Sequence, residues 1–197
     1  MVNVQVDGED SWMFQIPATE VSYLQAESAG LPHHVINVSG EPEQEVLELH
    51  DGLLPLTKDV DGLVSGALRS EYQRRRIDGI CEDLGIRSFS PLWHHDPLKH
   101  MRELVECNVE MIMVSVSCDG LDESWLGRTL DEPALEELEM ASAEFRFNVD
   151  GEGGEFETLV VAGPHLDWSI NIEHEVTWDG SRGHIMITSA GLQKSGI

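Results

Sequence analysis

Residues 62–73 have the sequence GLVSGALRSEYQ, in which a short apolar stretch runs directly into a polar one. The apolar part, Gly62–Gly66, predicts a short β-strand. The polar part predicts the start of a helix, because Ser70 and Gln73 have the spacing of a capping box. We expect the helix to end at Gly85, since glycine accepts the left-handed backbone of a C-terminal cap. Its apolar face consists of Ile77, Ile80, Cys81 and Leu84.

Strands and helices also alternate upstream of this junction. Strands are predicted at residues 2–6 and 35–38, and a helix capped by Thr19 is expected between them. A second helix is expected over residues 41–49, with Gly52 among the residues that break it.

The alternation continues downstream to about residue 147. This order predicts an α/β fold with a mostly parallel sheet, followed by a smaller α+β portion. We expect two domains, residues 1–95 and 96–197. The downstream elements are a strand over 89–93, a helix opened by Asp96, a strand over 109–116, a helix over 133–145 and two strands within 168–187.

The charge of the chain is strongly negative. The formal net charge is -25 and the pI about 4.4, with acidic residues spread along the whole sequence. Nine arginines accompany only three lysines. We infer a halophilic, archaeal source, because strong screening in high salt makes such self-repulsion tolerable. The same charge argues against nonspecific nucleic-acid binding.

Apolar runs and cysteines bear on the location of the protein. No apolar run approaches the roughly 20 residues that span a bilayer, and the start lacks a secretory pattern, so we expect no membrane partner and a cytoplasmic protein. Cys81, Cys107 and Cys118 are odd in number and widely spaced. Reduced core residues are the favoured interpretation, with a metal or disulfide role as the alternative.

The junction from Gly66 to Gln73 is the first candidate site, because ligands of open α/β sheets bind beyond the carboxyl ends of the strands. The helix N-terminus offers N–H groups to phosphate, Glu71 adds a carboxylate and Tyr72 adds a ring that could stack. The alternative is an ordinary capped helix with solvated polar residues, which the spacing alone favours.

The second candidate site is Gly151–Thr158, with the sequence GEGGEFET. Its glycines permit unusual backbone angles, and its carboxylates alternate along an incipient strand. Such carboxylates can hold Mg²⁺ or accept a proton from an attacking amine. The alternative is a glycine-rich turn on a surface that is acidic throughout.

Two histidine pairs and a tryptophan complete the candidates. Adjacent histidines on a strand point to opposite faces, so neither His33–His34 nor His94–His95 is predicted to bind a metal. Trp93 is expected to end its strand at the same sheet edge as Gly66. A core or interface aromatic is the alternative role for Trp93.

Several segments resemble, in order, the diphthine–ammonia ligase family. The most specific is Gly151–Thr158, and together the segments cover nearly the whole chain. The others are Ser11–Phe14, Leu24–Glu27, Ser70–Gln73 with Arg76, Pro91–Trp93, Gly120–Leu121, Trp125–Arg128 and the Thr177–Ile187 hairpin.

The resemblance implies an enzyme of the PP-loop ATP pyrophosphatase type, with a Rossmann-like, adenine nucleotide alpha hydrolase-like sheet. Such an enzyme uses ATP and Mg²⁺ to adenylate the carboxylate of diphthine, a modified histidine on translation elongation factor 2. Ammonia then displaces AMP from the acyl-adenylate to give diphthamide.

The resemblance also implies a role for individual residues, with a nucleotide-binding domain over 1–95 and a substrate-side subdomain over 96–197. The catalytic residues would be Glu152, Glu155 and Glu157. The nucleotide would lie at Gly66, Ser70, Glu71, Tyr72, Gln73 and Arg76, and the substrate at Met13, Phe14, Trp93, Gly127, Gly153, Gly154 and Thr158.

One part of the family pattern is missing. The resemblance implies an opening strand, the loop Ser-Gly-Gly-Lys-Asp-Ser and a helix, and no such loop occurs in the sequence. We therefore expect a sheet without its first strand, which would lie between residues 2–6 and 62–66, and a chain that folds poorly alone. Either Met1 is a misplaced start, which we favour, or the chain is a fragment that needs a partner or has lost catalysis. Translating the in-frame DNA upstream of Met1 separates these explanations.

Three functions remain open from the sequence. The leading one is the ligase, with little or no activity expected of this exact chain because the phosphate loop is absent. The others are a noncatalytic module that binds the elongation factor, and a ligase acting on another carboxylate.

Overall fold

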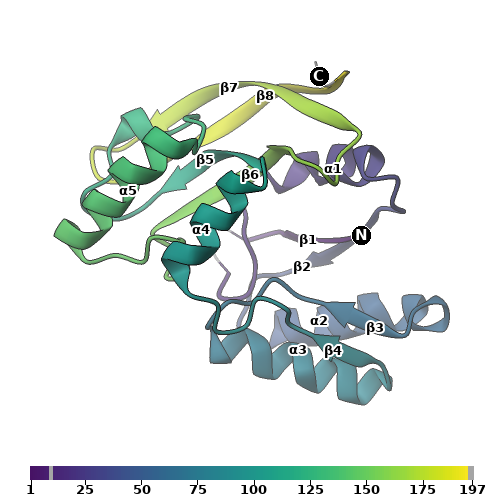
Figure 1. The fold of residues 1–197 in the computed structure, drawn as a ribbon. Coiled ribbons are helices and arrows are strands. Elements are labelled where there is room, and N and C mark those ends of the chain that lie inside the picture. The colour runs from purple at the N-terminus through teal and green to yellow at the C-terminus, as the bar shows by residue number, and fades with distance from the viewer. Residues whose placement is uncertain (9–10, 195–197) are drawn as a thin grey trace. The chain divides into compact units, whose positions relative to one another are not determined.

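The computed structural model describes residues 1–8 and 11–194, which form two compact units. The N-terminal unit comprises Val2–Thr19 and His34–His95. The C-terminal unit comprises Met1, Glu20–His33 and Asp96–Ile197. Figure 1 labels the α-helices and β-strands of both units. The segment Glu20–His33 thus groups with the later half of the chain, although it lies between two segments of the N-terminal unit.

The strands of the N-terminal unit form two parallel pairs. β1 (Val2–Val6) pairs with β2 (His34–Val38), and β3 (Gly62–Val64) pairs with β4 (Arg87–Phe89). Each pair is a separate two-stranded sheet. The expected parallel α/β arrangement is confirmed, and it takes the form of two short sheets.

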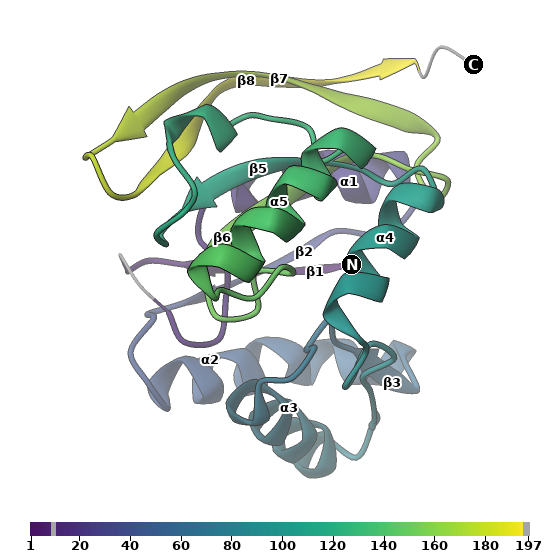
Figure 2. The same ribbon diagram turned by 60° about the vertical axis from the view of Figure 1, so that its left-hand side comes forward.

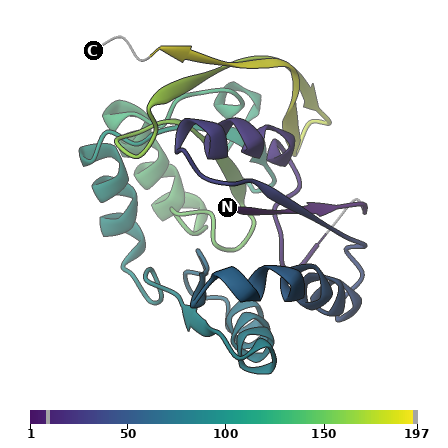
Figure 3. The ribbon, with the colours of Figure 1, turned by 90° about the vertical axis from the view of Figure 1, so that its right-hand side faces the viewer.

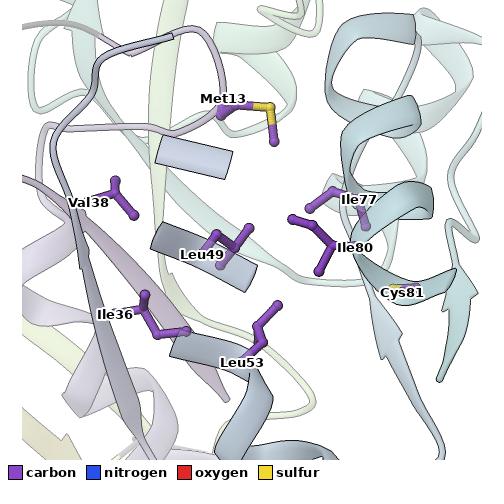
Figure 4. Packing of buried hydrophobic residues seen from close by; sticks show 8 residues of the cluster. All are labelled: Met13, Ile36, Val38, Leu49, Leu53, Ile77, Ile80 and Cys81. Carbon is purple, nitrogen blue, oxygen red and sulfur yellow. The ribbon is translucent and has the colours of Figure 1, made fainter. Parts of the chain in front are cut away.

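Three helices complete the N-terminal unit, namely α2 (Gln44–Leu53), the 3-10 helix η2 (Leu54–Asp59) and α3 (Glu71–Leu84). The predicted caps of α3 are present: Ser70 Oγ accepts the Gln73 N–H at 3.3 Å, and Gly85 has a φ of 69°. Figure 4 shows the core that these elements enclose, built from Met13, Ile36, Val38, Leu49, Leu53, Ile77, Ile80 and Cys81.

Gly52 does not break α2, contrary to the sequence prediction. The helix continues through it to Leu53. A Cβ on Gly52 would lie 2.5 Å from the Ile36 side chain, so glycine here allows the helix to approach β2 closely. A glycine that serves close packing was therefore mistaken for a helix breaker.

The C-terminal unit contains a four-stranded antiparallel sheet in the order β6-β5-β8-β7. Its strands are β5 (Glu110–Val116), β6 (Phe156–Ala162), β7 (Trp168–Trp178) and β8 (Gly183–Lys194). The strand expected at 109–116 exists, but its partners run antiparallel, so parallel pairing ends with β4. This sheet confirms the expected change of architecture after the α/β portion.

The remaining helices bury apolar faces against this unit. The longest, α5 (Glu132–Phe145), buries Ala134, Leu135 and Leu138, and Figure 2 shows it running beside α4. No helix among the residues that the structure describes is long and apolar enough to cross a membrane. The other helices are η1 (Thr19–Val21), α1 (Ser22–Ser28), α4 (Pro97–Glu106) and η3 (Glu123–Trp125).

The last residue of helix α1, Ser28, is hydrogen-bonded to β7. Figure 3 shows α1 alongside the β7 and β8 ribbons. Ser28 Oγ accepts the N–H of Trp168 at 2.8 Å and donates to its carbonyl oxygen at 2.6 Å. The Asp167 N–H also donates to the Ser28 carbonyl oxygen, at 3.0 Å. Ser28 is 1% exposed, so these bonds lie in a protected setting.

Two sequence predictions about element ends are wrong. The strand expected to reach Trp93 ends at Phe89, and Pro91–Trp93 form a turn, because proline has no N–H to continue a strand ladder. Thr19 does not cap α1. Its hydroxyl donates to the Ile16 carbonyl oxygen at 3.0 Å, while Val21 occupies the cap position without a side-chain bond.

Candidate functional site

The loop at residues 11–14 is anchored by one serine in the N-terminal unit. Ser11 Oγ donates to Glu45 Oε2 at 2.7 Å. The same oxygen accepts the N–H groups of Met13 at 3.1 Å and Phe14 at 3.0 Å. Because Glu45 is fully buried at the start of α2, the loop is held to that helix.

The same loop is bonded to the start of α3. Gln73 Nε2 donates to the Met13 carbonyl oxygen at 3.2 Å. The Met13 side chain is only 6% exposed and packs in the core, with Phe14 partly buried against it. The structure therefore brings together Met13, Phe14 and Gln73, but Met13 serves the core through its side chain and the contact to α3 through its backbone.

Tyr72 and Arg76 stack on each other one turn apart in α3. The Arg76 guanidinium carbon lies 3.3 Å from the centre of the Tyr72 ring, and Arg76 also forms an ion pair with Glu43. The ring of Trp12 meets Tyr72 edge-on at 5.6 Å. Tyr72 Oη and Arg76 Nε are buried and have no hydrogen-bond partner within residues 1–8 and 11–194. Buried polar atoms without partners are rare in proteins, so this pair has unused capacity for a polar ligand group.

The other residues predicted to bind the nucleotide have fewer free polar groups. Ser70 Oγ is occupied as the cap of α3, and Glu71 pairs with Arg75 at 3.1 Å on the exposed side of the helix. A Cβ on Gly66 would meet nothing within 4 Å, so the backbone there borders open space. The Arg76 guanidinium could pair with a phosphate group only if it left Glu43.

Trp93 lies in the turn after β4. The Arg74 guanidinium carbon is 4.4 Å from the centre of its indole, and the His94 ring stacks on it at 4.8 Å. The tryptophan is therefore fixed between a helix side chain and its own neighbour. This contact links the predicted substrate residue Trp93 to the same helix, α3, that carries Tyr72 and Gln73.

The second cluster is the glycine-rich loop of the C-terminal unit, which Glu155 holds in shape. Glu155 Oε1 accepts the backbone N–H of Asn148 at 2.9 Å and its side-chain amide at 2.8 Å. Glu155 Oε2 accepts the Gly153 N–H at 2.7 Å. Since both carboxylate oxygens are engaged within the loop, Glu155 acts as its internal support.

Ser117, which follows β5, ties the loop to the sheet. Its hydroxyl donates to the Gly154 carbonyl oxygen at 2.5 Å, and its N–H donates to the Glu155 carbonyl oxygen at 2.8 Å. The Glu152 N–H approaches Asp150 Oδ1 at 3.5 Å. The predicted residues Glu152, Gly153 and Gly154 thus belong to one anchored loop.

Glu157 has a different environment from Glu155. It lies on β6 directly opposite Ser115 of β5. Burial raises the pKa of its carboxyl to about 7. Its Oε2 is buried and accepts no hydrogen bond from the part of the chain described here. A carboxyl group with a pKa near neutrality can take up and release protons at physiological pH, as a general base requires.

Thr158 and Gly127 lie on either side of Met113 in β5. Thr158 on β6 is the strand partner of Met113, and the Gly127 N–H donates to the Met113 carbonyl oxygen at 2.8 Å. Gly127 has a φ of 78°, and a Cβ there would lie 2.4 Å from the ring of His174. Only glycine fits this position, where it lets the 125–130 segment run along β5.

Two family models match this chain. One, described as the diphthamide synthase N-terminal domain, matches residues 1–88, and the other, described as its C-terminal domain, matches residues 96–192. A zebrafish (Danio rerio) protein named diphthine–ammonia ligase is 30% identical over 181 residues, which cover 85% of this chain and 71% of the zebrafish protein.

The chain belongs to the diphthine–ammonia ligase family. The rat (Rattus norvegicus) and human proteins with that name are each 33% identical to it, over 82% and 80% of this chain. The chain spans 65% of the rat protein and 64% of the human one. The expectation from the sequence segments is confirmed at the level of the family.

In this member of the diphthine–ammonia ligase family, sequence inspection missed the residues that hold the two clusters. Glu45, Ser117 and Asn148 carry no recognisable pattern, because their roles depend on partners far away in the chain. The described residues include no group of three or more His, Cys, Asp or Glu side chains arranged to hold a metal ion.

Proposed function

We propose that this protein acts in the ATP-dependent amidation of diphthine on translation elongation factor 2, through an acyl-adenylate, to give diphthamide. The observation that carries the proposal is Glu157, a half-buried carboxyl with a pKa near 7 that lies beside the glycine-rich loop of this chain. Family membership supports the ligase reaction in general, and this carboxyl supplies its proton acceptor.

The residues of this chain divide the work as follows. Glu155 and Ser117 keep the loop rigid, so that the backbone of Gly153 and Gly154 is presented in one shape to the substrate. Glu157 accepts the proton that ammonia loses as its nitrogen bonds to the activated carbonyl carbon and the bond to AMP breaks. Glu152 remains a predicted catalytic residue at the edge of the loop.

ATP, when bound, supplies the adenylyl group that turns a carboxylate oxygen into a leaving group. Gly66 offers an open backbone and Arg76 a positive charge for its phosphates, and Tyr72 Oη has unused hydrogen-bonding capacity beside Arg76. Mg²⁺ would be held mainly by the phosphates, as is usual for this ion.

The test expresses the gene with the DNA upstream of Met1 retained, and incubates the product with ATP, Mg²⁺, ammonium and diphthine-bearing elongation factor 2. We expect AMP release and the mass change of carboxylate to amide on the factor, both lost in Glu157→Gln. A product that binds the factor without AMP release would instead support the noncatalytic module. Amidation of free small acids but not of the factor would support a ligase for another carboxylate.

A further inference from the structure

Glu157 stands at one end of a row of polar residues that crosses the C-terminal sheet. Ser115 on β5 is the strand partner of Glu157 on β6 and, on its other side, of His184 on β8. Strand partners in antiparallel sheets project from the same face with their Cβ atoms about 5 Å apart. Thr177 on β7, the partner of His184, extends the row by one more strand.

The opposite face of the sheet is apolar at the same level. The neighbouring pair Val116 and Phe156 is 1% and 3% exposed and points away from the row. The row itself runs from partly buried Glu157 and Ser115 to exposed His184. It therefore leads from a carboxyl that lacks a hydrogen-bond partner on Oε2 to a side chain in contact with water.

Such a route would connect the buried Oε2 of Glu157 with solvent. Once Glu157 has taken a proton from a substrate, the proton has to reach solvent before the next cycle. The hydroxyl of serine both donates and accepts hydrogen bonds, and histidine changes its charge near neutral pH, so both can pass protons on. The side chains of Ser115 and His184 form no hydrogen bond with any other described residue, Glu157 included, so both remain available to a relay.

We propose that Glu157, Ser115 and His184 form a proton relay that connects the candidate catalytic carboxyl with solvent. The protonated carboxyl of Glu157 gives its proton to Ser115 Oγ through a bridging water or after a change of side-chain rotamer, while the hydroxyl proton of Ser115 moves to a ring nitrogen of His184, directly or through water. His184 then releases a proton to solvent, and the hydroxyl returns to its starting state. Ser115 and His184 are positioning residues, and their role in catalysis rests on the proposed function.

The test measures proton exchange at Glu157 in the full chain, without ATP or elongation factor. The protein is labelled with ¹³C at its glutamate carboxyl groups, and the Glu157 signal is assigned by its loss in Glu157→Gln. Relaxation dispersion near pH 7 gives the rate at which the carboxyl exchanges its proton. We expect Ser115→Ala and His184→Gln each to slow this exchange several-fold while the titration midpoint of Glu157 stays near 7.

Matched variants separate a relay from a general loss of structure. Ser115→Thr keeps the hydroxyl, so Glu157 should exchange its proton at the wild-type rate in this variant. The same rate is expected in Thr177→Val, which lies beyond His184 in the row, and in Ser189→Ala on the exposed part of β8. Free imidazole should restore the rate in His184→Gln but not in Ser115→Ala. Unchanged exchange in both Ser115→Ala and His184→Gln would refute the relay. If the two variants slow proton exchange as expected but the wild-type protein does not amidate elongation factor 2, only the proposed function is refuted.

Discussion

Two carboxylates only two residues apart have different surroundings. Glu155 accepts three hydrogen bonds from Asn148 and Gly153, so both of its oxygens are engaged within the loop. Glu157 sits on the strand that follows, where burial favours its neutral form and raises its pKa. The sequence placed both in one candidate site but gave them the same role, because a strand's alternation does not reveal which side chains receive hydrogen bonds.

Replacing Glu157 by Gln should stabilise the folded protein at pH 8 and not at pH 4. The carboxyl pKa rises from 4.5 to about 7 on folding, so between these values the folded state keeps a proton that the unfolded chain has released. The free energy of unfolding therefore falls as pH rises through that window. Each unit of pKa shift corresponds to about 1.4 kcal/mol, so the total loss is roughly 3 kcal/mol. Glutamine removes the cost of the charge. Urea unfolding at the two pH values measures the difference.

Glu175→Gln on exposed β7 is the control for this experiment, and it should change stability at pH 8 by much less than Glu157→Gln does. Equal stability of wild type and Glu157→Gln at pH 8 would show that Glu157 is not buried enough to resist ionisation.

At the scale of elements, local patterns predicted the junction of β3 and α3 well. Ser70 and Gly85 cap α3 as their sequence positions indicated, because capping depends on neighbours within four residues. Predictions failed where a distant partner decides. Gly52 stays in a helix because Ile36 lies against it, and β5 takes antiparallel partners that no local pattern specifies.

Ser70→Ala should lower the free energy of unfolding by about 1 kcal/mol, because the Gln73 N–H loses its acceptor. Ser70→Asp should retain most of the stability, since aspartate is an equally good cap and suits the positive end of the helix dipole. Thermal and urea unfolding of the three proteins measure the effect. If Ser70→Ala were as stable as wild type, Ser70 would be available to a ligand rather than committed to the helix.

At the scale of the whole molecule, charge is the dominant property. A net charge of -25 over 197 residues means that folding gathers mutually repelling carboxylates. The ion pairs between exposed side chains, such as Lys99–Glu103 at 3.5 Å, contribute little against this repulsion. The sequence alone predicts this repulsion, because it depends on composition and not on the fold.

We therefore expect the folded fraction to rise with salt concentration up to the molar range, where the Debye length shrinks to about 3 Å. Circular dichroism across a potassium chloride series measures it. Sucrose provides the control, because it favours compact states without screening charge. A fold that is equally complete in dilute buffer and in molar salt would contradict both the expectation and the inferred halophilic source.

The position of α1 has a consequence for inheritance. The two family models match consecutive segments of the chain, residues 1–88 and 96–192, as if each half were a separate module. Yet Glu20–His33, encoded within the first block, packs with the second, and Ser28 is bonded to Trp168. A gene fusion or exchange with its crossover near codon 95 would separate α1 from its partner strands. The two halves are therefore expected to have been passed on as a single hereditary unit, and a half transferred alone would arrive without part of its own fold.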